Sequence, residues 1–255
     1  MLSEKAKKAF FDLNLPYSAV ALKFCRNKPE GYQQAEEKDK FCTFVKKAQD
    51  GNKPFYTTIE NDVCMGKFAL GMAEPDSASA SGMIGHEVEI FKTPAANARL
   101  FYEAPMLKRG VCNFVVFCPL EQCGFDPDLI ICIADADQTQ VILRATSYIS
   151  GDLWEAKCTY VMSCAWAYVN PYITGKVNHL LAGMYFGQQQ RNTYPVGLHI
   201  ISIPFQKIDE VVSALTEMRH VPAELGKDEK SLAETQVIHD HIAKISSDIN
   251  IPNRL

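Results

Sequence analysis

Two continuous apolar runs, GVCNFVVFCPL (110–120) and PDLIICIAD (127–135), constrain the fold of this 255-residue chain more than any other feature. Neither run alternates between apolar and polar side chains, and both contain β-branched residues. That pattern is typical of strands that are buried on both faces of a sheet. We therefore predict buried strands over residues 112–118 and 128–134.

Other segments predict further strands and several helices. Strands are expected over 18–25, 55–59 and 197–203, and helices over 3–13, 41–51, 135–148 and 205–218. Because the strands and helices intersperse without regular βαβ repeats, the pattern indicates the α+β class. We expect a single compact domain over residues 1–222, with a mixed or antiparallel sheet flanked by helices. A charged helical C-terminal extension is expected over residues 223–255.

Two local expectations follow from small residues and from proline. The segment AEPDSASASGMIG (73–85) is small and polar, which is typical of a mobile loop. A helix is expected from about Ser163 until Asn170-Pro171, because proline lacks the amide hydrogen that a continuing helix needs.

Composition excludes several classes of function. The formal net charge is −4, which does not indicate a protein that binds nucleic acid or an anionic membrane. No apolar run approaches the ~20 residues that cross a bilayer. The first residues, MLSEKAKKAFFDLNLP, form a charged amphipathic segment and not a signal peptide. We expect a cytoplasmic protein that binds a small molecule, whose oligomeric state the sequence leaves open.

The cysteines of the chain are expected to be reduced thiols. There are nine, an odd number, and many lie in apolar stretches, which argues against a disulfide framework. Cys112, Cys118 and Cys132 lie inside the apolar strand runs and are expected in the core. Cys123 follows in a turn, EQCGFDP, and is expected to be exposed.

Cys64, in the stretch NDVCMGKFALGM (61–72), allows three interpretations. We expect Asp62 to cap a helix that runs through Phe68 and Leu70, with Cys64 in its first turn, where the helix dipole lowers a thiol pKa. Cys64 is then a metal ligand or a nucleophile. The third interpretation is a small buried thiol that packs in the core.

Other polar residues are candidates for binding an anion. Lys23 follows an apolar strand, where a lysine faces either solvent or a cleft, and Arg144 and Arg191 are further cations. His179 precedes two leucines and is expected to be structural. The chain contains no dinucleotide-binding, P-loop, nucleophile-elbow or zinc-protease motif, which disfavours the common nucleotide-dependent and hydrolytic enzymes.

Four segments together resemble a known family. They are VALKF (20–24), KFC followed by a helix and a glycine (40–51), FYTTIENDVCMGKFALGM (55–72) and CAWAYVNPYITGKVN (164–178). In order and spacing, over roughly residues 10 to 220, they resemble domain of unknown function 169, also called ArCR, of archaea and anaerobic bacteria. The family carries no established activity.

The resemblance implies which positions recur in the family. These are Cys42, Cys64 and Cys164, together with Lys23, Pro171, Tyr172 and Gly175. Members often have a further cysteine after the Pro-Tyr pair, where this chain has Met184, so a fourth thiolate from that position is not implied.

These positions lead to two hypotheses about function. In the first, Cys42, Cys64 and Cys164 bind an iron–sulfur cluster of the 4Fe–4S type, because three ligands leave one iron open for a ligand. Lys23, Tyr172 and Arg191 would then line an entrance for a small anion. In the second, the cysteines are structural and the protein is a non-enzymatic binding or accessory protein. Whether the protein is an enzyme stays open.

Overall fold

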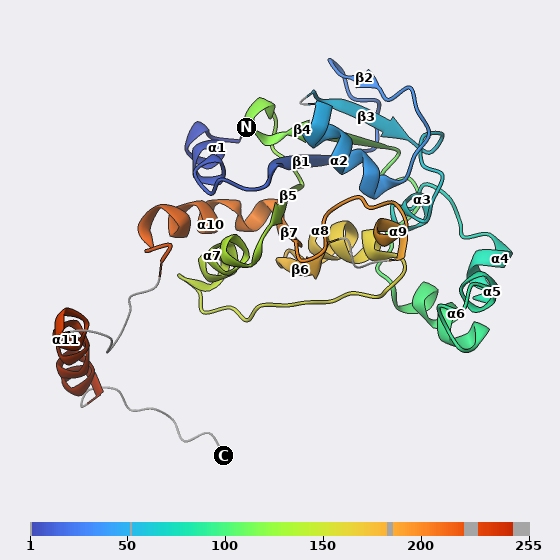
Figure 1. Cartoon of the computed structure of the whole chain (residues 1–255). Helices are drawn as coiled ribbons and strands as arrows, with labels where there is room; N and C mark the ends of the chain where they lie inside the picture. The colour runs from blue at the N-terminus through green and yellow to red at the C-terminus, as the bar shows by residue number, and fades with distance from the viewer. Residues whose placement is uncertain (1, 52, 183–185, 222–228, 247–255) are drawn as a thin grey trace. The chain divides into compact units, whose positions relative to one another are not determined.

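A seven-stranded sheet forms the centre of the structure, a computed structural model that describes residues 2–51, 53–182, 186–221 and 229–246 (Figure 1). The strand order is β2-β3-β4-β1-β5-β7-β6. Adjacent strands are antiparallel except for the parallel pair β2 and β3, so the sheet is mixed. The strands are β1 (Tyr17–Cys25), β2 (Gln33–Gln34), β3 (Phe55–Thr58), β4 (Phe114–Pro119), β5 (Leu129–Ala134), β6 (Asn178–Leu181) and β7 (His199–Pro204).

The three central strands, β4, β1 and β5, are buried on both faces. Leu22 pairs with Phe117 on one side of β1 and with Leu129 on the other, and all three belong to one apolar cluster. The alternate residues Ala21 and Ile130 are paired in the same way but belong to a second cluster on the opposite face. The two apolar runs are therefore continuous in sequence because successive side chains enter two different cores.

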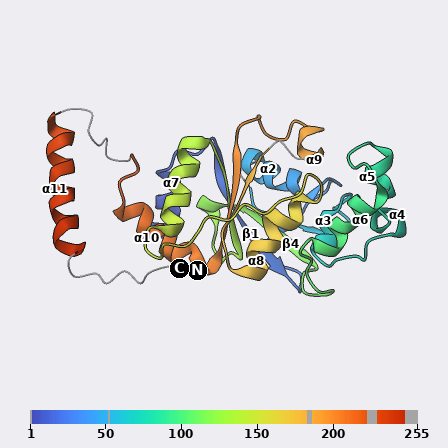
Figure 2. The same ribbon diagram turned by 90° about the horizontal axis from the view of Figure 1, so that it is seen from below.

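Helices cover each face of the sheet, which gives three layers (Figure 2). The helices α1 (Glu4–Phe11), α7 (Ala136–Ser147) and α10 (Phe205–Glu217) contribute to the cluster that contains Ile130. On the other face lie α2 (Phe41–Gly51) and a π-helical segment (Ala165–Val169) that continues into α8 (Asn170–Thr174). The α+β class and the sheet flanked by helices, both predicted from the sequence, are confirmed.

The chain divides into two units, Met1–Met218 and Arg219–Leu255. The first contains the sheet and its helices, and the second contains α11 (Glu229–Ser246). Within the described residues, no helix is long and apolar enough to cross a membrane.

The expected loop over 73–85 is instead part of a small helical lobe, so that expectation is wrong. The helices α4 (Ser77–Ala80) and α5 (Met83–Glu87) form there and pack with α6 (Pro94–Glu103). The Asp76 side chain caps α4 by accepting a hydrogen bond from the Ser79 amide. Gly82 has φ 77°, and a Cβ there would lie 2.0 Å from the Pro94 carbonyl oxygen. We call Ser77–Glu103 the α4–α6 lobe.

The expectation that the helix stops at Asn170-Pro171 is also wrong, because it continues to Thr174. In the π-helical turn, Pro171 would hydrogen-bond to the carbonyl of Trp166, five residues earlier. Proline has no amide hydrogen, and the buried Asn178 side chain donates to that carbonyl at 2.8 Å. The helix ends at Gly175, which has φ 66°.

Phe117 tests the importance of the core on the α2 face. Its ring is fully buried and lies 5.1–5.9 Å, centroid to centroid, from the rings of Phe41, Phe44 and Phe55. Phe117→Ala should lower the free energy of unfolding by about 3–5 kcal/mol, measured by urea denaturation. The matched control is Phe11→Ala, at a side chain that is 67% exposed, which should change stability by no more than about 0.5 kcal/mol. Equal effects of the two substitutions would contradict this assignment of the core.

Candidate functional site

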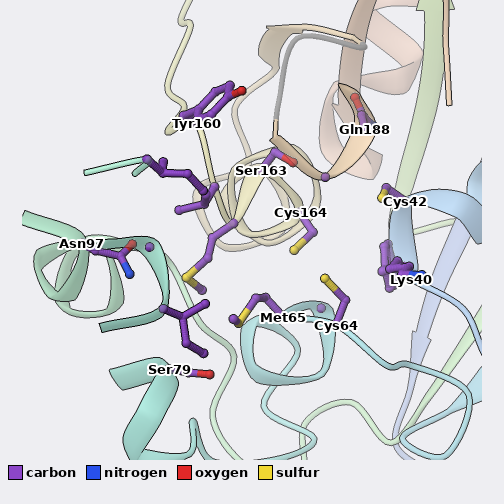
Figure 3. A pocket seen from close by; sticks show the side chains of 18 of the residues that line it. Lys40, Cys42, Cys64, Met65, Ser79, Asn97, Tyr160, Ser163, Cys164 and Gln188 are labelled. Atoms are coloured by element: carbon purple, nitrogen blue, oxygen red, sulfur yellow. The ribbon is translucent and has the colours of Figure 1, made fainter. Parts of the chain in front are cut away.

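Three of the nine cysteines line one cavity of about 220 Å³ (Figure 3). Cys42 lies in the first turn of α2, Cys64 lies before α3 (Gly66–Ala69), and Cys164 directly precedes the π-helical segment. In Figure 3 the three sulfur atoms face the same space. The structure therefore brings together the three cysteines that the family resemblance implied, from three separate segments of the chain.

Cys42 is fixed by the packing of α2 and contacts a cation. The aromatic rings of Phe41 and Phe44 anchor the first turns of α2 against Phe117 of β4. The Arg191 guanidinium donates a hydrogen bond from Nη2 to the Cys42 Sγ at 3.0 Å. Arg191, which was predicted as an anion ligand, also lines the cavity.

Cys64 is presented by a turn that a buried carboxylate organises. The Asp62 Oδ1 accepts a hydrogen bond from the Cys64 amide at 2.8 Å, and Asp62 is only 6% exposed. Helix α3 begins at Gly66, so the expected helix through Leu70, with Cys64 in its first turn, is wrong. A Cβ on Gly66 would lie 2.3 Å from the Asp62 Oδ2 and 2.7 Å from the Phe41 Cβ. Glycine at this position allows the Cys64 turn to lie directly against α2.

Cys164 is held by the π-helical segment that follows it. The side-chain nitrogen Nδ2 of Asn178, in β6, donates to the backbone carbonyls of Lys157 and Trp166, at 2.9 and 2.8 Å. The Trp166 indole donates to Thr159 Oγ1 at 2.9 Å. These bonds tie the segment before Cys164 and the helix after it to the same edge of the sheet.

Burial keeps all three thiols in their neutral form. It raises the pKa of Cys42 and of Cys64, and it raises the pKa of Cys164 well above its ordinary value. Arg191 opposes the effect of burial at Cys42, and the Met65 amide and Arg191 oppose it at Cys64. Asp62 adds to the effect of burial at all three thiols. The expectation that a helix N-terminus lowers the Cys64 pKa is therefore wrong, because desolvation outweighs the local dipoles. A nucleophilic cysteine needs a lowered pKa, so the structure does not favour that interpretation.

Asp62 is an acidic group that adds to the raised pKa of all three thiols. Burial raises the Asp62 pKa to about 6, although the Cys64 amide partly stabilises the carboxylate. Its Oδ2 is buried without a hydrogen-bond partner among the described residues. Asp62 therefore changes its charge near pH 6 and is mostly ionised at pH 7.

The donor set fits a cluster better than it fits a single metal ion. Among the described residues, no three His, Cys, Asp or Glu side chains are close enough to hold one ion. Ligands of an iron–sulfur cluster bind different irons and need not converge on a single point. Thiolates are the ligands that such clusters prefer, and a nearby guanidinium offsets their negative charge.

Lys23 and Tyr172 lie outside the lining of this cavity. The Lys23 ammonium donates to the Asp126 carbonyl at 2.8 Å and pairs with Asp128 at 3.4 Å. Side chains alternate along β1, so Lys23 leaves the strand on the face opposite to Leu22 and α2. Tyr172 packs edge-on against the Phe24 ring, with centroids 5.0 Å apart. The expectation that these residues line the same entrance as Arg191 is not met.

Other predicted residues are placed as follows. Arg144 lies in α7, in the layer on the other side of the sheet. His179 lies in β6, and its Nε2 is 2.8 Å from the Nδ1 of His199. Cys112, Cys118 and Cys132 are fully buried, as predicted, whereas Cys123 is 1% exposed and belongs to the core, so its expected exposure is wrong. Met184 lies outside the described residues.

Sequence reasoning missed much of the cavity wall. The α4–α6 lobe supplies one side of it, and the segment Tyr160–Ser163 supplies another. One feature of the sequence does indicate the first helix of the lobe. Asp76 is a preferred N-cap residue, and its side chain accepts a hydrogen bond from the Ser79 amide. No motif in the sequence connects the lobe with the cysteines.

Gly66 offers a test of the close approach between the Cys64 turn and α2. Gly66→Ala should lower the free energy of unfolding by about 1–3 kcal/mol, because the new methyl group must displace Asp62 or Phe41. A Cβ on Gly51, at the end of α2, meets nothing within 4 Å, so Gly51→Ala should be neutral or stabilise by up to about 1 kcal/mol. Urea denaturation of both variants gives the comparison. A neutral Gly66→Ala would show that the turn does not need this approach.

Comparisons with known proteins give a family and one relative. An uncharacterised protein of Methanocaldococcus jannaschii is 25% identical over 226 residues, which span 86% of this chain and 96% of that protein. No solved structure gives a significant match. The model of the uncharacterised ArCR family, domain of unknown function 169, matches residues 12–214, a range that contains all three cavity cysteines and Arg191. The chain belongs to the ArCR family.

Proposed function

We propose that Cys42, Cys64 and Cys164 bind an iron–sulfur cluster with an open iron site for a small anionic ligand. The observation that carries this proposal is the convergence of three thiols, from three separate segments, on one cavity. In the described part of the chain, the other six cysteines are absent from the lining of that cavity. Three protein ligands, one fewer than the usual four, leave one iron position free.

The charge balance of the site supports this assignment. The three thiols are neutral in the protein alone because burial disfavours their charged forms. A bound metal deprotonates coordinating thiols, since its charge stabilises the thiolates. Binding of a metal centre must overcome the raised pKa of these thiols, and the Arg191 guanidinium lowers that cost at Cys42 and Cys64. When bound, such a cluster supplies electron transfer and a Lewis-acidic iron.

The residues around the thiols have separate roles in this proposal. Asp62 fixes the turn that carries Cys64, and Gly66 lets that turn approach α2. Arg191 holds the Cys42 sulfur and offsets the negative charge that builds up when the thiols ionise. Lys40, directly before α2, is the second cation in the cavity lining, and its ammonium pairs with Asp39 at 3.8 Å.

A second candidate function is a non-enzymatic binding protein with structural thiols. Two observations favour it: the cavity wall is mainly apolar, and no single-ion site exists among the described residues. Such a protein would bind a small molecule without iron. The two candidates differ in metal content.

The iron content of the protein distinguishes the two candidates. Protein purified and reconstituted without oxygen should be brown and contain about four irons and four sulfides per chain. Single Cys→Ser substitutions at positions 42, 64 and 164 should each lower the iron content by at least half. Cys25→Ser and Cys158→Ser are the matched controls, since both residues lie outside the cavity, and they should retain it. Colourless, iron-free protein after reconstitution would exclude the cluster and leave the second candidate.

The redox potential tests the role of Arg191. Arg191→Gln removes a positive charge and a hydrogen bond to Cys42, both of which stabilise the reduced, more negative state of a cluster. The potential of the variant should fall by tens of millivolts in a redox titration followed by electron paramagnetic resonance. Arg99→Gln changes a guanidinium that pairs with Glu103 on an exposed helix face, and should leave the potential unchanged. An identical potential in Arg191→Gln would show that Arg191 does not act on the cluster.

A further inference from the structure

The cavity has two sides of different character. In Figure 3 the thiols lie on one side, and Ser79 and Asn97 of the α4–α6 lobe lie on the opposite side. The thiol side also carries both lining cations, Lys40 and Arg191. The lobe side is mainly apolar.

Two apolar side chains on the lobe side are largely exposed to solvent. Ile84 and Val88 line the cavity and are 46% and 51% exposed. Ile90 and Phe101 continue this wall, and Met162 lies in the lining near Cys164. Covering such a surface with a hydrocarbon chain is favourable, because it removes apolar area from water.

The helices of the lobe pack directly on one another. Asn97 of α6 is 5% exposed and donates from Nδ2 to the Gly82 carbonyl at 3.0 Å. A Cβ on Gly85 would lie 2.6 Å from the Asn97 amide, so glycine allows α5 to pack directly on α6. The helices that carry the apolar side chains are therefore held relative to one another before any ligand binds, which reduces the entropy lost on binding.

The charges on the thiol side favour a single anionic group. The described lining residues include two cations and no Asp or Glu. Gly187 lies against the Arg191 guanidinium, since a Cβ there would be 3.0 Å from Nη2. Arg191 uses Nη2 to bind Cys42, and its buried Nε has no hydrogen-bond partner among the described residues. A planar carboxylate matches the donors that a guanidinium presents.

We propose that the ligand of this cavity is an amphipathic monocarboxylate. Its carboxylate lies on the side of Arg191 and the thiols, and its hydrocarbon chain lies against Ile84, Val88 and Phe101 of the α4–α6 lobe. This proposal rests on the proposed function, in that the carboxylate is the small anionic group that the site takes. The lobe then selects ligands by chain length.

A series of straight-chain carboxylates measures this selection. Butanoate, hexanoate, octanoate and decanoate are titrated into the reconstituted full-length protein by calorimetry without oxygen. Each added methylene should lower Kd about fourfold until the cavity is filled. Octanol, which has the same chain without the charge, should bind more weakly than octanoate, and Arg191→Gln should reduce that difference.

A substitution that fills part of the cavity tests where the hydrocarbon chain of the ligand lies. Val88→Phe places a ring in the apolar side of the cavity and should weaken octanoate about tenfold, with little effect on butanoate. Val196→Phe, at a side chain that is 76% exposed and outside the described lining, is the matched control. Ile84→Ala removes apolar wall without adding bulk and should weaken octanoate more than butanoate.

The outcomes separate this proposal from the proposed function. A Kd that is independent of chain length, or equal effects of Val88→Phe and Val196→Phe, would overturn the amphipathic ligand even if iron is present. If the protein contains no iron but Kd still falls with chain length, the lobe is supported as the binding wall and the cluster is excluded. Iron content measured on each variant shows which case applies, because Val88→Phe should leave it unchanged.

Discussion

The burial of both faces of the central strands is the constraint on which the rest of this structure depends. The strands β4, β1 and β5 have no polar side on which water is tolerated, so each face must carry its own layer of helices. On one face that layer includes α2 and the π-helical segment, with the Phe41 and Tyr168 rings 4.6 Å apart. Cys42 follows Phe41 and Cys164 precedes the π-helical segment, so covering the sheet also sets the thiol positions.

The site forms where this helical layer ends and the lobe begins. Cys64 comes from neither, and it reaches the cavity because Asp62 and Gly66 hold its turn against α2. On one side the cavity borders the apolar core, which is tightly packed. The buried thiols therefore lie in an environment of low polarity. Their neutral state is therefore a consequence of where the sheet is covered, because burial disfavours the charged form of a thiol.

The sequence predicted the fold where side chains were buried on both faces, and it failed where packing used small residues. The run LIICIA, short and rich in β-branched residues, favours a buried strand, and β5 forms there. The edge strand β6 carries the short NHLL stretch, which has no alternation to detect, and α4, the first helix of the lobe, consists only of Ser and Ala. Pro171 was misread because its lost hydrogen bond is compensated by Asn178, a contact between segments. The grouping of three cysteines came from a family resemblance, since no spacing within the chain indicates it.

The strand order also determines when the cavity can exist during folding. Val20 of β1 pairs with Pro119 of β4, and the two residues are about a hundred positions apart in the chain. Pairings between such distant segments slow folding, because the entropy of closing a long loop is lost before contacts compensate for it. Cys164 and Arg191 come later still in the chain, so a nascent chain that emerges from the ribosome with β1 and α2 has no complete cavity. Any ligand that needs the complete cavity must therefore be acquired after synthesis has passed Arg191.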